Sequence, residues 1–165
     1  MKNKQSNVAR TILTVLSIAV VCMIFFNSML DAEESTGMSN PLVEGINRFL
    51  ASVHLDITVT EKTVRKAAHF TEYAILGALL SATIYLYVLK RKETFVMALS
   101  AGCGVAVCDE AIQLFPKGRS CEVKDMLIDC AGVLLSVLIV QLILFLKEKH
   151  NTKKEGKKSG RFIAE

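Results

Sequence analysis

The sequence MLIDCAGVLLSVLIVQLILFL, residues 126–146, carries one charged side chain, Asp129, in an otherwise uncharged run. About 20 apolar residues at a rise of about 1.5 Å each are enough to cross the hydrocarbon core of a bilayer. We expect a helix, because backbone polar groups in lipid must pair within their own segment. The stretch therefore predicts a transmembrane helix with one charge near its beginning.

Three earlier stretches have the same character: Thr11–Leu30, about Ala67–Leu89 and about Phe95–Phe115. The chain of 165 residues is 52% hydrophobic with a mean hydropathy of +0.40, which is too apolar for an ordinary soluble domain. We therefore predict an all-α integral membrane protein, a four-helix bundle that lies in the cell membrane as a multi-pass protein. The first stretch starts like a signal peptide, but it is long and lacks a small-residue cleavage site, so we expect a retained anchor.

The positions of lysine and arginine predict the orientation of the bundle. If both termini are cytoplasmic, 13 of the 20 basic residues lie inside, within residues 1–10, 90–92 and 147–161. The positive-inside rule favours that orientation. The chain then divides into an N-terminus with the first helix (1–30), an extracytoplasmic loop (31–64), a three-helix core (65–146) and a basic cytoplasmic tail (147–165).

Two of these parts lie outside the predicted core. In the extracytoplasmic loop, apolar residues recur at helical spacing from Leu42 to Leu50, and Asn40 and Pro41 suit the N-cap and the first helical position. Such an amphipathic helix either lies along the membrane surface or packs over the bundle, and the sequence favours neither. We expect the tail to be disordered and attracted to lipid headgroups.

The five cysteines do not have the spacing of metal ligands, so we interpret them as small packing residues. No metal site and no cofactor are predicted from the sequence.

Charged side chains interrupt the predicted membrane helices at three places only, and alternating helix directions bring all three to the outer face. Arg65, His69, Glu72 and Tyr73 form the first group, a stripe at i, i+4, i+7 and i+8. A charge at the bilayer centre costs roughly 2.5–3.5 kcal/mol, and less near an interface. These residues therefore indicate an internal partner or a function.

The third and fourth helices supply the other two groups. Asp109 and Gln113 align at i and i+4 near the end of the third helix, and Asp125 and Asp129 align near the start of the fourth. Small residues accompany both stripes and permit close helix packing, namely Gly102, Gly104, Gly132 and Ser136.

The connection after Phe115 contains Pro116 and Gly118, which end the third helix and allow a tight turn. Arg119 follows, and we expect it to be the counter-charge for one of three aspartates, Asp109, Asp125 or Asp129. A guanidinium at this position could also bind phosphate through two hydrogen bonds.

These residues resemble a known family. The sequence is similar to the VanZ family of small bacterial membrane proteins over about residues 60–140, through the pattern Lys66-x-x-His69-x-x-Glu72-Tyr73, Asp109-Glu110-x-x-Gln113-x-Phe115-x-x-Gly118-Arg119 and Asp125-x-x-x-Asp129. The resemblance implies a Gram-positive source and a multi-pass protein. For the member that names the family, it also implies low-level resistance to the lipoglycopeptide teicoplanin.

We predict from the charged groups and the resemblance that the protein works in the cell envelope, at the outer face. Its expected partners are the lipid bilayer and a lipid-linked cell-wall precursor or anionic headgroup, with no nucleic acid. The expected ligand-binding residues are Arg65, Lys66, His69, Glu72, Tyr73, Asp109, Glu110, Gln113, Arg119, Asp125 and Asp129.

Three other interpretations remain. In an enzyme acting on a lipid-linked substrate, His69, Glu72, Asp109 and Glu110 would be the acid or base candidates, and Asp125 with Asp129 could hold a divalent cation. The sequence favours binding over catalysis, because no nucleophile stands next to a base. A buried charge ring could instead only lock the helices in register. Transport is disfavoured, since four helices leave little room for a pathway.

Overall fold

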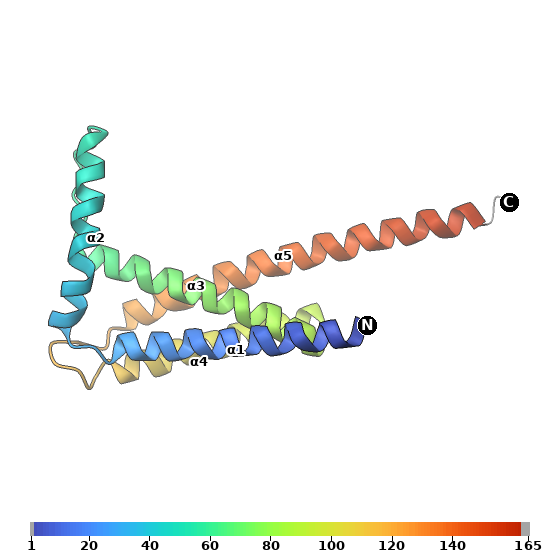
Figure 1. Cartoon of the computed structure of the whole chain (residues 1–165), viewed down its shortest axis with the longest axis horizontal. Helices are drawn as coiled ribbons and strands as arrows, with labels where there is room; N and C mark the ends of the chain where they lie inside the picture. Colours follow the sequence, from blue (N-terminus) through green and yellow to red (C-terminus); the bar gives the residue numbers. More distant parts are fainter. Residues whose placement is uncertain (1, 163–165) are drawn as a thin grey trace.

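The computed structural model describes residues 2–162 and contains five helices within them (Figure 1). They are α1 (Lys2–Ser28), α2 (Ala32–Ser52), α3 (Glu61–Val88), α4 (Arg91–Ile112) and α5 (Val123–Phe162). No strand occurs among the described residues, so the predicted all-α fold is confirmed.

Four of the helices, α1, α3, α4 and α5, are long and apolar enough to cross a membrane. Each contains most of one of the four predicted segments. α3 begins a few residues earlier than predicted, because the Thr60 side chain caps it by accepting a hydrogen bond from the Thr63 amide at 3.3 Å. Large apolar side chains such as Phe26, Ile75 and Leu142 are exposed on the outside of the bundle, where they would face lipid.

Helix α3 lies at the centre of the packing and contacts each of the other four helices. Gly132 of α5 sits against the backbone of Phe70, and Gly77 of α3 sits against Val133 and Ser136, so no side chain fits at either glycine. The predicted close approach at Gly132 and Ser136 is therefore confirmed. Gly102 also meets Val133, whereas Gly104 faces open space, so the packing role predicted for Gly104 was wrong.

The start of α1 and the end of α5 point to one end of the bundle, and α2 and the connection 113–122 lie at the other (Figure 1). Helix α2 runs across this end instead of along the bundle, and none of its residues is buried. That this end faces the outside of the cell stays a prediction of the positive-inside rule.

Two sequence predictions for the peripheral segments were wrong. Helix α2 begins at Ala32, not near Asn40, and Pro41 lies inside it. The earlier start follows from Asp31, whose backbone N–H donates to the Glu34 carboxylate at 3.3 Å, as in a capping box. The tail is helical through Phe162 as a continuation of α5, because it begins with lysine and glutamate residues, which are good helix formers.

Candidate functional site

A cavity of about 190 Å³ opens at the end of the bundle that carries α2, between α3, α5 and the connection 113–122. Helix α3 contributes Arg65, Lys66 and His69, and α5 contributes Asp125 and Asp129. The other lining residues are Lys62, Glu110, Gln113, Gly118, Arg119, Ser120, Glu122 and Ile128. The structure thus brings eight of the predicted ligand-binding residues to one cavity, and leaves Glu72, Tyr73 and Asp109 outside its lining.

The polar stripe predicted on α3 is only partly together in the structure, because Glu72 turns toward α1. Tyr73 is fully buried, and the His69 side chain is 17% exposed. Lys66 reaches across to α5 and forms an ion pair with Asp125, whereas Arg65 pairs with Glu61 of its own helix at 3.4 Å. Arg65 and Lys66 therefore lie at the rim of the cavity and already have acidic partners.

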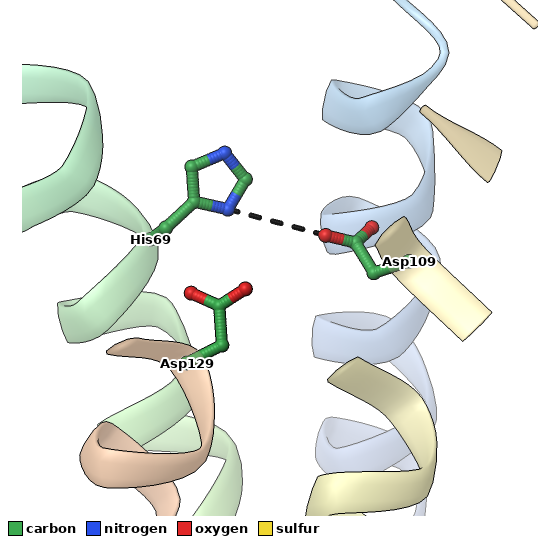
Figure 2. Close-up of side chains that lie close together, drawn as sticks. All are labelled: His69, Asp109 and Asp129. Carbon is green, nitrogen blue, oxygen red and sulfur yellow. Dashed lines mark ion pairs between the residues drawn. The ribbon is translucent and has the colours of Figure 1, made fainter. Parts of the chain in front are cut away.

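Asp109 of α4 is fully buried behind the cavity. The side-chain amide of Gln113 donates to Asp109 Oδ2 at 3.3 Å and to the Ser28 hydroxyl at 3.4 Å. His69 Nδ1 lies 4.0 Å from the same Oδ2 (Figure 2). The predicted alignment of Asp109 with Gln113 is confirmed, and the aspartate also faces the histidine of α3.

Asp129 of α5 completes a trio with His69 and Asp109. It is 1% exposed, and its carboxylate points toward the other two side chains (Figure 2). His69 Nδ1, Asp109 Oδ1 and Asp129 Oδ1 are all buried, and none has a hydrogen-bond partner among the described residues. Buried polar atoms without partners are costly, so the described protein atoms alone leave this trio electrostatically incomplete.

Glu72 faces α1 instead of the charged cavity, and its Oε1 accepts a hydrogen bond from the Asn27 side-chain amide at 3.0 Å. It lines a second cavity, of about 210 Å³, which shares Arg65, His69 and Arg119 with the first. Asn27 was not singled out in the sequence. The available signal was that it is the only amide side chain in the first predicted membrane segment.

Glu110 is almost fully buried, and it contacts the connection 113–122. Its Oε2 accepts a hydrogen bond from the backbone N–H of Glu122 at 3.0 Å. This contact holds the connection 113–122 over the cavity, so the carboxylate of Glu110 fixes the loop that carries Arg119.

Arg119 lies where the two cavities meet, and its Nη2 donates to the Asn27 carbonyl at 3.3 Å. It forms no ion pair within 4.0 Å with a carboxylate of the described residues, although the charge of Asp109 acts on its pKa. Lys66 takes Asp125 instead, because it stands directly opposite on α3. The role of Arg119 as a counter-charge for an aspartate stays a prediction.

The chemistry of Arg119 suits an external anion. Its buried Nε has no hydrogen-bond partner among the described residues. Burial lowers the pKa of the guanidinium, and the charge of Arg65 lowers this pKa further. Arginine nevertheless stays cationic at neutral pH, so an unpaired positive charge is present at the junction of the cavities.

The comparison with known families agrees with these motifs. A sequence model of the VanZ/LLP1 family matches residues 13–145. The chain belongs to the VanZ/LLP1 family. The match extends into α1 and so includes Asn27, beyond the range of about 60–140 over which the motifs predicted the resemblance. No curated protein sequence and no solved structure matches the chain. Family membership and four apolar helices together identify a VanZ-like multi-pass membrane protein.

Proposed function

We propose that this VanZ-like protein binds the anionic headgroup of a lipid-linked envelope compound in the outer leaflet of the cell membrane. The observation that carries the proposal is the continuity of an apolar groove with the charged cavity. A ligand with a hydrocarbon chain and a charged headgroup needs both surfaces side by side.

The groove lies between α2 and α3, with a volume of about 510 Å³. Four of its lining residues, Leu42, Val64, Ala68 and Glu72, also line the second cavity, which in turn reaches Arg119. A hydrocarbon chain in the groove would therefore bring its headgroup to Arg119. The remaining groove residues are Ile46, Val59, Thr63, Ala67 and Thr71.

Four basic residues surround the charged cavity: Lys62, Arg65, Lys66 and Arg119. Basic side chains near an anionic lipid surface are each worth about 1 kcal/mol, and arginine can bind phosphate or carboxylate through two hydrogen bonds. Arg119 is the cation that carries the headgroup contact in this proposal. The ion pairs of Arg65 and Lys66 are already formed, and Lys62 does not line the second cavity, which joins the groove.

Binding of the lipid is tested with the purified full-length protein in nanodiscs. We expect a polyprenyl phosphate to bind at least tenfold more tightly than the uncharged polyprenol of the same length, and inorganic phosphate alone to bind weakly. Arg119→Gln should weaken binding of the phosphate lipid at least tenfold, since a hydrogen bond to a charged group contributes about 1.5–3 kcal/mol. Arg48→Gln is the matched control, because Arg48 lies on the exposed surface of α2.

The groove has its own test. Ala68→Phe places an aromatic ring where the groove meets the second cavity, and Ala101→Phe places the same ring on the outside of α4. We expect only the first substitution to weaken lipid binding. Equal affinities for the phosphate and the alcohol, or an unchanged affinity of Arg119→Gln, would overturn the proposed headgroup contact.

A lipid-linked wall precursor at the outer face is the target that glycopeptides meet, so we extend the proposal to teicoplanin tolerance. A sensitive strain that expresses the wild type should survive more teicoplanin than a strain with Arg119→Gln, with membrane levels of both proteins measured. If the wild type gives no protection, the resistance role is excluded, and the lipid-binding measurement stands separately.

A further inference from the structure

The trio of His69, Asp109 and Asp129 combines side chains from α3, α4 and α5 (Figure 2). Each residue offers one ligand atom, and the three atoms lie within 4.8 Å of one another. Ligand atoms of one tetrahedral metal ion with bonds of about 2.1 Å are about 3.4 Å apart. Small side-chain rotations would therefore bring the three atoms to a common metal ion.

The two carboxylates of the trio are also incompletely paired within the part of the chain that the structure describes. Both aspartates are at most 1% exposed, and each has a buried oxygen without a hydrogen-bond partner among the described residues. No lysine or arginine of the described residues forms an ion pair with either aspartate: Lys66 pairs with Asp125, and Arg119 contacts no carboxylate within 4.0 Å. Two carboxylates at membrane depth call for a positive partner.

We propose that His69, Asp109 and Asp129 bind one divalent transition-metal ion. One imidazole nitrogen and two carboxylate oxygens suit Zn²⁺ or Mn²⁺ better than Mg²⁺ or Ca²⁺, which prefer oxygen ligands alone. Gln113 supports the site from behind by donating to Asp109 Oδ2, as outer partners of metal ligands commonly do.

The position of the trio gives the ion access to the charged cavity, because His69 and Asp129 also line it. A three-ligand site of this kind keeps a further coordination position for water or for an anion. The metal would add a second positive group beside Arg119. Binding of the metal itself does not depend on the identity of the lipid, so the two proposals can fail separately.

The experiment measures metal binding by the full-length protein in lipid-free detergent micelles. The five free cysteines could also bind Zn²⁺, so they are first replaced by alanine, and the cysteine-free protein serves as the reference. Titration calorimetry with ZnCl₂, MnCl₂ and MgCl₂ gives affinity and stoichiometry, and the visible spectrum of the Co²⁺ form reports nitrogen and oxygen ligands.

We expect one Zn²⁺ or Mn²⁺ ion to bind per chain, and Mg²⁺ to bind at least tenfold more weakly. Asp129→Asn and His69→Gln should each weaken binding of the transition metal at least tenfold. Two controls should bind it as the reference does: Asp56→Asn and His54→Gln, both on the exposed segment after α2. Equal binding by Asp129→Asn and the reference would overturn the site.

Thermal unfolding separates the metal from a purely protonated trio. Without metal, Asp129→Asn should be at least as stable as the reference, because it removes a buried carboxylate that has no partner. With excess Zn²⁺, the unfolding temperature of the reference should rise and that of Asp129→Asn should not. If neither protein responds to Zn²⁺ or Mn²⁺, protons neutralise the trio and the metal site is excluded.

Discussion

The side-chain amide of Asn27 in α1 donates a hydrogen bond to Glu72 of α3 at 3.0 Å. The backbone carbonyl of the same residue accepts a hydrogen bond from Arg119 at 3.3 Å. Asn27 thus links α1 to α3, which carries part of the VanZ motif, and to the connection 113–122, which covers the charged cavity. Through these contacts, α1 becomes part of the end of the bundle that carries the two cavities.

The first prediction concerns this contact. Asn27→Leu leaves the half-buried Glu72 without its donor, and we expect a loss of about 1–3 kcal/mol of stability, because an unsatisfied buried polar group keeps its full desolvation cost. Glu72→Gln should cost less, since a glutamine oxygen can still accept from Asn27. Thermal unfolding in detergent checks both. Asn7→Leu, at an exposed position of the same helix, is the control and should be neutral.

The sequence predicted the helices and the gathering of the charged groups for a physical reason. A membrane helix must be about 20 residues long, and alternating directions return every second helix end to the same side. Charges at the ends of three such helices therefore meet wherever the connections are short. Helical spacing then turned Arg65 and His69 to the cavity, whereas Tyr73 is buried behind it and Glu72 faces α1.

The sequence could not predict which charged side chains contact one another within the site. Whether Lys66 or Arg119 neutralises Asp125 depends on the depth and facing of α3 against α5, and periodicity gives neither. The approach of Asp129 to His69 depends on the same packing. The contact of Asn27 was missed because a single amide in an apolar run has no periodic partner.

The second prediction compares two glycines in membrane helices. A β-carbon at Gly132 would overlap the backbone of α3 at Phe70, whereas one at Gly104 meets open space. Gly132→Ala should therefore destabilise the protein by about 1–3 kcal/mol through overpacking. Gly104→Ala should be neutral or stabilising by up to about 1 kcal/mol, because it restricts the unfolded chain. Thermal unfolding of both variants tests the pair, and similar losses at the two positions would contradict the packing of α3 on α5.

The third prediction concerns orientation. Lys117 lies on the exposed connection beside the cavity, and Lys92 lies exposed near the opposite end of α4. In a cysteine-free background, a membrane-impermeant maleimide should label Lys117→Cys on intact cells and label Lys92→Cys only after permeabilisation. The opposite labelling pattern would place the cavity in the cytoplasm and exclude an outer-leaflet ligand.

The fourth prediction concerns helix α2, which crosses the end of the bundle and has no buried residue (Figure 1). Its Phe49 is 65% exposed and Met38 is 69% exposed. A helix in this position whose apolar residues lack protein cover is stabilised if it rests in the membrane interface. We therefore expect α2 to lie along the outer surface of the bilayer, with its apolar side chains among the lipid headgroups.

The chain contains no tryptophan, so a single substitution gives a clean fluorescence signal for the depth of α2. In lipid vesicles, Phe49→Trp should be quenched more strongly by a spin label near the headgroups than by one deep in the acyl chains. Leu138→Trp, exposed near the middle of the apolar span of α5, is the control and should show the reverse order. Efficient quenching of Phe49→Trp by aqueous iodide, with no effect of either lipid label, would mean that α2 stands in water. The groove between α2 and α3 would then open to solvent instead of to the acyl chains, and a hydrocarbon tail would have no direct path into it.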